Sequence, residues 1–237
     1  MDLKEEHILG DAIHEHWYYV SKGRAMRQVL GGIRTREVLD VGAGSGIFSR
    51  QLLDYGVADS AVCVDPLYDE ERTESHNGRP IAFVRQVDNV TQNLVLMMDV
   101  LEHVDDDVGL LRQYAPQGHV LITVPAFPFL WSGHDVFLEH RRRYTRSMLE
   151  KTVRDAGLEV VQLLFFFGSL FPAVAAVRLA KKGLLRQGVV EARSELSLYP
   201  SWLNRALIAV HDVERHTLFP INTLAGLSLF CLCRKQS

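Results

Sequence analysis

The stretch EVLDVGAGSGIF, residues 37–48, joins an apolar run to three closely spaced glycines and then to a second apolar run. Gly42, Gly44 and Gly46 follow a G-x-G-x-G spacing, and glycine adopts backbone conformations that side chains disfavour. A strand that ends in such a turn lets a ligand approach the backbone closely. The stretch therefore predicts a buried strand, a ligand-binding turn and a helix, in that order.

Short apolar runs alternate with helical patterns along most of the chain. We expect helices before residue 31 and at 47–56, 105–118 and 145–157, and strands at 37–44, 61–66, 81–88, 94–101, 119–125, 158–168 and 226–235. Strands that alternate with helices indicate an α/β fold, in which a mainly parallel sheet has helices on both faces. In such a sheet, ligands bind at the carboxyl ends of the strands, where the glycine turn lies.

Composition and charge limit the class of protein. The 237 residues are 47% hydrophobic and 23% charged, which suits a single α/β domain over 1–237 with an N-terminal helical cap at 1–32. The formal net charge of −3 gives no general attraction for nucleic acid, so we expect no nucleic-acid partner. Three cysteines and a start without a basic-then-apolar signal pattern predict a cytoplasmic protein with reduced thiols.

Acidic residues accompany the predicted strand ends. Asp40 precedes the first glycine of the turn by two residues; an acid there would repel a pyrophosphate but would suit a ligand that carries a cation. Asp65, followed by Pro66, ends the second strand and could accept hydrogen bonds from ribose hydroxyls. Asp88 follows the third strand, where it could accept from an adenine amine, and Asp99 lies late in the fourth. These acids predict a ligand with a cation, a ribose and an adenine.

In this order and spacing, the segment DVGAGSG (40–46), Asp65, Asp88 and the segment MMDVLEHV (97–104) resemble the motifs of class I S-adenosylmethionine-dependent methyltransferases of the small-molecule type. The resemblance extends over about 10–168 and resumes at 222–235. It implies a Rossmann-like sheet of seven strands, with the last strand antiparallel and inserted beside the fifth. It also implies S-adenosyl-L-methionine as cofactor and S-adenosyl-L-homocysteine as product. A nicotinamide dehydrogenase is disfavoured, because Ile47 stands where the third dehydrogenase glycine would be.

The resemblance also assigns cofactor contacts. It implies that residues 42–44 approach the methionine part, that Asp65 binds the ribose and Asp88 the adenine, and that Met98 faces the open side of the cofactor. The helix HWYYVSKGR (16–24) supplies candidates to cover the cofactor or meet its carboxylate. The full predicted cofactor set is Tyr18, Lys22, Arg24, Asp40, Gly42, Ala43, Gly44, Gly46, Asp65, Pro66, Asp88, Met98 and Asp99. Asp88 could instead cap a helix, and Asp99 could pair locally.

The stretch PAFPFLWSGHDVFLEHRRRYTRSML (125–149) follows the fifth strand at the same end of the sheet. Its histidines suit the removal of a proton from a methyl acceptor, since the pKa of imidazole is near ~6.5. His134 or His140 is therefore our candidate general base, and Asp135 could orient or bind the acceptor. A purely structural hydrogen bond is the alternative for each histidine.

Further residues are candidates for binding the acceptor. This set is His103, Trp131, Arg141, Arg143 and Tyr144. The arginine run 141–143 could bind a phosphate or carboxylate of the acceptor, or it could form a solvated face. His134, Asp135 and His140 could also be metal ligands, but they lie in one loop without a second cluster, so we expect no metal.

Between the last two strands, residues 169–221 form a predicted helical insertion. Its first part, SLFPAVAAVRLAKKGLLR, is apolar and then basic, but it is too short and interrupted to span a membrane, which takes about 20 residues. It could be a lid over a hydrophobic substrate, a peripheral membrane contact through 169–188, or a core or dimer helix.

Together these features predict an enzyme that moves a methyl group from S-adenosylmethionine to a hydroxyl or amine of a small acceptor, hydrophobic or lipid-linked. Two alternatives stay open. One is a protein side-chain methyltransferase, which the insertion disfavours because a protein substrate needs an open groove. The other is a non-catalytic protein that binds the cofactor, which the polar residues of 125–149 disfavour.

Overall fold

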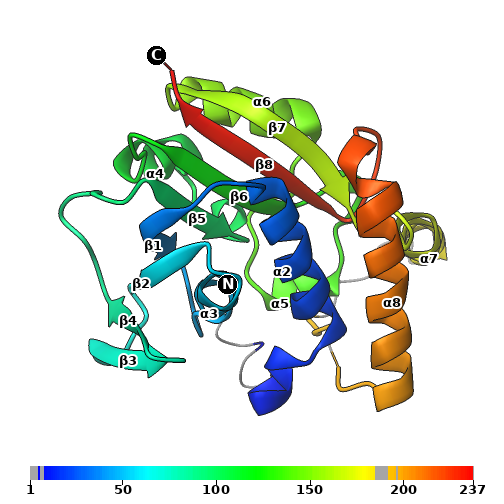
Figure 1. Cartoon of the computed structure of the whole chain (residues 1–237). Helices are drawn as coiled ribbons and strands as arrows, with labels where there is room; N and C mark the ends of the chain where they lie inside the picture. Colours follow the sequence, from blue (N-terminus) through cyan, green and yellow to red (C-terminus); the bar gives the residue numbers. More distant parts are fainter. Residues whose placement is uncertain (1–4, 6–7, 185–191, 196, 237) are drawn as a thin grey trace.

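The computed structural model describes residues 5, 8–184, 192–195 and 197–236 of the chain (Figure 1). Its centre is an eight-stranded sheet in the order β3-β4-β2-β1-β5-β6-β8-β7. The strands are β1 Thr35–Val41, β2 Ala58–Val64, β3 Arg72–His76, β4 Arg79–Val84, β5 Leu94–Met98, β6 His119–Pro125, β7 Leu158–Phe166 and β8 Ser228–Lys235.

The middle of the sheet is parallel and one end of it is antiparallel. β1 pairs in parallel with β2 and β5, β2 with β4, and β5 with β6. β8 runs antiparallel to both β6 and β7 and lies between them. The predicted Rossmann-like methyltransferase sheet, with its last strand inserted beside the strand at 119–125, is thus confirmed.

Helices cover both faces of the sheet (Figure 1). They are η1 Gly10–His14, α2 Trp17–Leu30, α3 Ile47–Asp54, η2 Leu101–His103, α4 Asp107–Gln113, η3 Pro128–Leu130, α5 Gly133–Phe137, α6 Arg146–Asp155, α7 Phe171–Leu184, α8 Ser201–Thr217 and η4 Phe219–Ile221. One apolar core packs α2 and α3 against the sheet, and a second packs α4 and α6 against the other face. Alternate strand residues point to opposite faces, so central strands such as β5 are apolar throughout.

One strand was not predicted. β3 forms an antiparallel hairpin with β4 at the edge of the sheet, so the sheet has eight strands rather than seven. Its sequence, RTESH, is polar and largely exposed, which gives no buried-strand pattern. Asn77 and Gly78 join the two strands with positive φ angles of +50° and +79°. Asn-Gly is a typical hairpin turn, and this signal could have indicated the strand.

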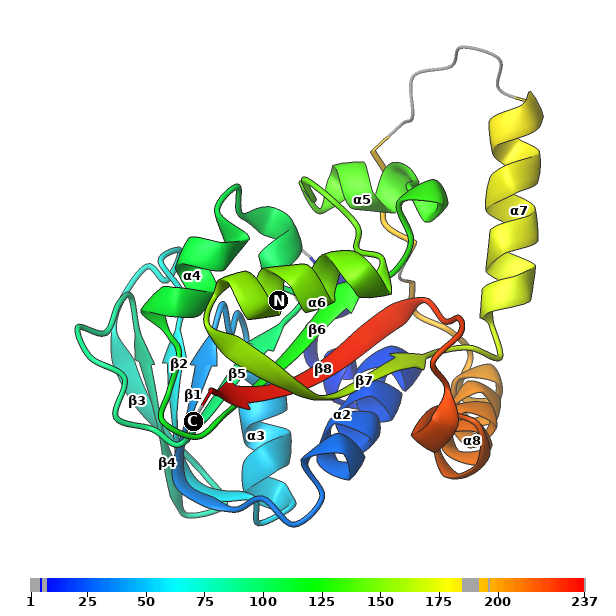
Figure 2. The same cartoon turned by 90° about the horizontal axis from the view of Figure 1, so that it is seen from above.

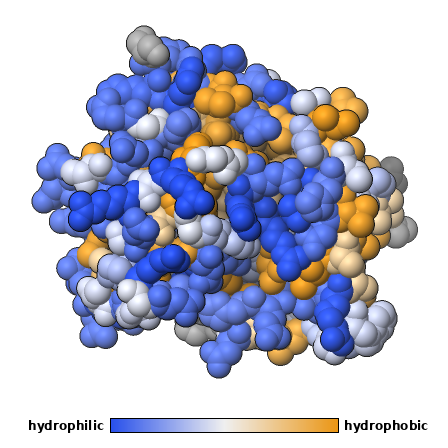
Figure 3. Space-filling model, in the orientation of Figure 1, coloured by the Kyte–Doolittle hydropathy of each residue, from blue (hydrophilic) through white to orange (hydrophobic). Residues whose placement is uncertain are grey.

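The helices α7 and α8, which lie between β7 and β8 in the sequence, are at one side of the molecule. α8 packs against α2, and Arg24 of α2 pairs with Asp212 of α8. Figure 2 shows α7 standing beside the sheet, near α5 and well away from β3. Figure 3 shows apolar side chains on the side of α7 and α8, on a face that is otherwise largely hydrophilic. No helix in the described part of the chain has the length and apolar character to cross a membrane.

Candidate functional site

The glycine turn follows β1 and leads directly into α3. Gly42, Gly44 and Gly46 have φ angles of +66°, +53° and +72°, a region that favours glycine. A Cβ atom on Gly42 would lie 2.8 Å from Cγ2 of Val100, so a side chain there would force a neighbour to move. Both the backbone conformation and the surrounding space therefore require glycine in this turn.

Asp65 holds the turn from the neighbouring strand. Its Oδ2 accepts a hydrogen bond from the backbone N–H of Gly44 at 3.2 Å, and its Oδ1 accepts from the N–H of Leu67 at 3.0 Å. The hydroxyl of Tyr68 donates to the carbonyl of Gly44 at 2.7 Å. β2 thus delivers a carboxylate to the glycine turn, at the position predicted from sequence.

Asp40 lies at the end of β1 and is buried. Its Oδ2 accepts a hydrogen bond from the hydroxyl of Ser49 on α3 at 2.8 Å. Burial raises the pKa of Asp40 to about 6, although the Ser49 hydrogen bond opposes this change. Asp40 therefore connects β1 to α3 below the turn, as well as placing an acid close to it.

Lys22, Tyr18 and Asp99 form a buried polar cluster between α2 and β5. Lys22 is fully buried and pairs with Asp99, and the hydroxyl of Tyr18 donates to Asp99 at 3.1 Å. The hydroxyl of Thr123 also donates to Asp99, at 3.0 Å. Burial disfavours the charge on Asp99, but the ion pair with Lys22 outweighs it and lowers the pKa to about 2. The predicted Lys22 and Asp99 thus neutralise each other.

The other predicted cofactor residues lie in varied places. Met98 is buried at the end of β5, and Ala43 is buried in the glycine turn. Pro66 and Asp88 are exposed, on the segments that follow β2 and β4. Arg24 faces α8, where it pairs with Asp212, so it joins two helices.

A cavity of about 440 Å³ lies beside the polar cluster, under the insertion. Its wall combines residues of α2, the segment after β5, the loop after β6, the end of β7, α7 and α8. These residues are Glu5, Trp17, Tyr18, Tyr19, Asp99, Glu102, His103, Pro125, His134, Leu138, His140, Arg143, Phe167, Leu170, Val174, Arg178, Glu195, Tyr199, Leu203, Leu207, Leu227 and Ser228. Predicted catalytic and substrate residues thus meet apolar side chains of the insertion in one cavity.

Asp135 organises the loop on one side of this cavity. It is fully buried in the first turn of α5, where its Oδ2 accepts from the backbone N–H of Ser132 at 2.8 Å. Its Oδ1 lies 2.9 Å from Nδ1 of His140 and accepts from Nε of Arg143 at 2.7 Å. Although burial opposes its charge, these donors hold the pKa of Asp135 well below its usual range. Asp135 thus orients His140 and Arg143, rather than standing free for an acceptor.

His134 lines the same cavity from α5. Its Nε2 lies 3.5 Å from a carboxylate oxygen of Glu5, and its Nδ1 accepts from the backbone N–H of Glu195 at 3.1 Å. Burial lowers the pKa of His134 to about 4, so the ring is neutral at neutral pH. Both predicted histidines are therefore at the cavity wall, but each already has a hydrogen-bonding partner.

The predicted substrate residues divide into two groups. His103 and Arg143 line the cavity, whereas Trp131, Arg141 and Tyr144 are not among its lining residues. Arg141 donates through Nε to the carbonyl of His103 at 2.8 Å, and the hydroxyl of Tyr144 donates to Asp107 at 2.7 Å. These contacts fasten the loop after α5 to the segment after β5.

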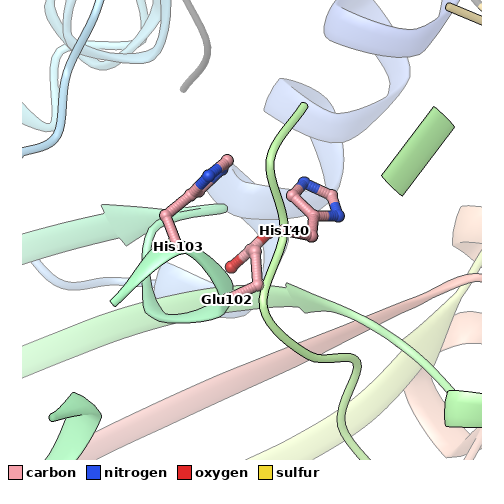
Figure 4. Close-up of side chains that lie close together, drawn as sticks. All are labelled: Glu102, His103 and His140. Atoms are coloured by element: carbon pink, nitrogen blue, oxygen red, sulfur yellow. The ribbon is translucent and has the colours of Figure 1, made fainter. Parts of the chain in front are cut away.

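Glu102 is a site residue that sequence reasoning did not select. It is fully buried on η2, and neither carboxylate oxygen has a hydrogen-bond partner within the described part of the chain. Together with His103 and His140 it forms a cluster whose candidate ligand atoms all lie within 4.8 Å of one another (Figure 4). The signal in the sequence was an acid directly after an apolar run, in MMDVLEHV.

Comparison with protein families gives one match, to the model described as a methyltransferase domain, over residues 15–163. This range runs from the start of α2 into β7 and includes the glycine turn. No curated protein matches the chain.

Comparison with solved structures adds likeness of fold. A chain of the complex between the Haloferax volcanii Trm112 methyltransferase activator and a methyltransferase has a TM-score of 0.55 at 15% identity, over 95% of this chain and 92% of that one. A Bacillus halodurans protein assigned as a methyltransferase has a TM-score of 0.52 at 17% identity, over 92% of this chain and 100% of that one. A Galdieria sulphuraria protein assigned as a sarcosine dimethylglycine methyltransferase has a TM-score of 0.50 at 14% identity, over 93% of this chain and 85% of that one.

The family match spans the glycine turn and the acid after β2, and the solved structures share the fold. These comparisons confirm the resemblance inferred from the motifs, with S-adenosylmethionine as the cofactor. The chain belongs to the class I S-adenosylmethionine-dependent methyltransferases.

Proposed function

We propose that this protein transfers a methyl group from S-adenosylmethionine to a hydroxyl or amine of a small, partly apolar molecule. The observation that carries the proposal is the cavity of about 440 Å³, in which acidic and histidine side chains meet apolar residues of α7 and α8. A volume of this size is typical of small-molecule sites. The mixed lining suits an acceptor that has a polar reacting group and an apolar body.

The residues at the glycine turn fit the cofactor. Two carboxylates, Asp40 and Asp65, lie next to the turn, which suits hydroxyl groups and a cation better than a pyrophosphate. When bound, S-adenosylmethionine supplies a methyl group on a positively charged sulfur. Asp65 would hold the ribose, and Asp88 would reach the adenine from the segment after β4. Tyr18 and Asp99, the latter paired with Lys22, also line the cavity, so they would stand between the cofactor and the acceptor.

A hydroxyl acceptor must lose its proton as the methyl group arrives, and His140 is our preferred base. Its Nδ1 faces Asp135, so Nε2 remains to take the proton. The carboxylate of Asp135 stabilises the imidazolium that this step forms. His134 is the alternative base, but the lowered pKa of its buried ring makes it the weaker proton acceptor.

The insertion favours a small acceptor over a protein side chain. Leu170 just before α7 and Val174 within it, with Leu203 and Leu207 of α8, supply apolar wall on the side of the insertion. A protein segment would need this side open. The alternative is a protein that binds S-adenosylmethionine without transferring its methyl group. A measurement of methyl transfer distinguishes this alternative from an active enzyme.

The test begins with calorimetric titration of the purified protein with S-adenosylmethionine, S-adenosylhomocysteine and NAD. We expect both methionine-derived ligands to bind and NAD to fail; the reverse result would overturn the proposal. A panel of hydroxyl and amine acceptors with apolar bodies is then screened for release of S-adenosylhomocysteine. Cofactor binding with release only on protein substrates would favour a protein methyltransferase.

A peripheral membrane contact through 169–188 remains a prediction, as does a cytoplasmic location. Val177 and Leu179 are about half exposed on α7, and Lys181 is exposed at its end, whereas 185–188 lie outside the described residues. Such a surface would suit an anionic bilayer. We expect co-sedimentation with anionic vesicles that Lys181→Glu weakens; equal sedimentation with and without vesicles would exclude it.

A further inference from the structure

We propose that Glu102, His103 and His140 form a binding site for a divalent cation in the wall of the cavity. Glu102 and His103 are neighbours on η2, and His140 comes from the loop after α5 (Figure 4). The three residues offer one carboxylate and two imidazole ligands. The site differs from the one conceivable from sequence, because Asp135 and His134 do not belong to it.

The first argument is the state of Glu102. Its side chain is fully buried, and both of its oxygens lack a hydrogen-bond partner among the described residues. A buried carboxylate without partners is costly, and buried charges in proteins are normally paired or bound to a metal. Its backbone carbonyl accepts from the N–H of Arg141 at 2.7 Å, which holds it in place. A cation would supply the missing partner.

The second argument is convergence. One candidate ligand atom from each of the three residues lies within 4.8 Å of the other two. Metal–nitrogen and metal–oxygen bonds are about 2.0–2.2 Å long, so ligand atoms around one ion lie about 3–4 Å apart. The cluster needs to contract by about 1 Å to bind one ion. Because Asp135 holds the ring of His140, binding requires the side chains of Glu102 and His103 to rotate toward it.

The third argument is the hydrogen bond between the other ring nitrogen of His140 and Asp135. Its Nδ1 lies 2.9 Å from Oδ1 of Asp135, and since a carboxylate only accepts, Nδ1 carries the proton. Metal-binding histidines almost always donate their other ring N–H to a carboxylate or a carbonyl, which fixes the orientation of the ring. Asp135 is itself fixed by Arg143 and by the N–H of Ser132. His140 is thus prepared to bind a cation through Nε2, with Asp135 as its positioning residue. The same nitrogen is the base of the proposed function, so His140 acts as a base only while no cation is bound to it.

The ligand set indicates the class of ion. Two imidazoles and a carboxylate suit Mn²⁺, Fe²⁺, Co²⁺ or Zn²⁺ better than Mg²⁺ or Ca²⁺, which prefer oxygen ligands. Three protein ligands leave coordination positions open, and all three residues line the cavity. An open position would therefore accept an oxygen or nitrogen atom of a molecule bound there.

The experiment measures cation binding directly. The full chain, without a polyhistidine tag and treated with chelator, is titrated with Mn²⁺ by electron paramagnetic resonance and with Co²⁺ by visible absorption. Neither cofactor nor acceptor is present. We expect one ion per chain, and a Co²⁺ spectrum that indicates nitrogen ligands. The titration measures cation binding without methyl transfer. Failure to bind a cation would therefore not contradict the proposed methyl transfer, and failure of the methyl-transfer screen would not contradict the cation site.

Variants assign the ion to these residues. Glu102→Gln keeps the size of the side chain, and we expect it and His140→Ala each to weaken binding by at least about tenfold. Asp135→Asn should weaken binding by about ten- to a hundredfold, the usual effect of an outer partner. His134→Ala removes another cavity histidine and is the matched control, which should bind as the wild type does. Circular dichroism and thermal melting verify that each variant is folded.

Any of three outcomes would overturn the site. The first is a wild-type protein that binds neither ion in the millimolar range, in which case Glu102 is a buried neutral acid. The second is wild-type affinity in the folded Glu102→Gln and His140→Ala proteins. The third is a loss of binding in the His134→Ala protein equal to theirs.

Discussion

The glycine turn and the cavity are built in opposite ways. The turn is one continuous stretch, residues 40–46, and its glycines adopt the backbone that this stretch needs. The cavity takes its wall from Glu5 at one end of the chain to Ser228 at the other. The first region is a local structure that one acid from β2 completes, whereas the second exists only once distant segments are packed together. Substitutions in the two regions should therefore change different properties, such as stability, affinity for the cofactor or KM for the acceptor.

The largest effect is expected for Lys22→Met, at the boundary of the two regions. Lys22 is fully buried against Asp99, and its loss leaves a buried carboxylate without its cation. We expect the free energy of unfolding to fall by about 3–5 kcal/mol in urea titrations. Arg24→Met is the matched control from the same helix, because its pair with Asp212 is partly exposed; it should cost less than about 1 kcal/mol. An equal loss of unfolding free energy in both variants would show that the buried ion pair stabilises the protein no more than the exposed one.

The two regions should also respond oppositely to pH. Burial raises the pKa of Asp40 from 3.8 to about 6, so the folded state holds the extra proton and stability falls as pH rises from about 4 to 6. Burial lowers the pKa of His134 from 6.5 to about 4, so the unfolded state holds the extra proton and stability falls as pH drops from about 6.5 to 4. Each effect amounts to about 3 kcal/mol over its range.

Urea unfolding of Asp40→Asn and His134→Asn between pH 4 and 7.5 separates these effects. Between about pH 4 and 6.5 the two effects oppose each other in the wild type, so removing one exposes the other. The Asp40 variant should lose stability as pH falls through this range, and the His134 variant should lose stability as pH rises through it. If both variants keep the wild-type pH profile, burial does not control these two groups.

Gly42→Ala tests the turn by itself. The substitution combines a left-handed φ of +66° with a Cβ atom only 2.8 Å from Val100. The backbone conformation alone costs about 1–2 kcal/mol, so we expect affinity for S-adenosylhomocysteine to fall about tenfold or more by calorimetry. Gly78→Ala is the control, with φ +79° and open space around the Cβ, in the β3–β4 turn. An equal loss in both variants would mean that general destabilisation, not the turn, weakens binding.

The smallest effect is expected for Val174→Ala, in the insertion. Val174 lines the cavity, and the loss of two methyl groups from a half-buried site costs about 1 kcal/mol. We expect the KM for an acceptor found in the screen to rise about fivefold, with affinity for S-adenosylhomocysteine unchanged. Val177→Ala, on the exposed side of the same helix, should change neither. A rise in KM for both variants would place the acceptor outside the cavity.

The fold could be predicted almost completely from the sequence. Apolar strands such as LVLMM, and helices that end at glycines, produce strong local patterns, and the order of motifs fixed the sheet. The edge strand β3 could not be found from burial, because RTESH has no apolar face. The predicted strand 94–101 ends three residues early, at Met98, where Asp99 adopts a φ of +57° and turns the chain into η2.

The arginine run shows why the site was harder to predict. Arg141 and Arg142 were candidates for binding an acceptor or for a solvated face. They donate instead to the carbonyls of His103, Val104 and Asp105, and so fasten the loop after α5 onto the segment after β5. Charge in a sequence indicates what a side chain can bind, but the partner depends on which segment lies opposite.

The sequence by itself determined the sheet, the glycine turn with Asp40 and Asp65, and the methyl donor, because each depends on residues that lie close together along the chain or on the order of strands. The tertiary structure decided the rest. It packs α7 and α8 over a cavity. It also brings Asp135 into contact with His140 and Arg143, and it places His140 beside Glu102 and His103. Almost forty residues separate His103 from His140 in the sequence, and only the packing of the loop against η2 brings their rings to 4.7 Å.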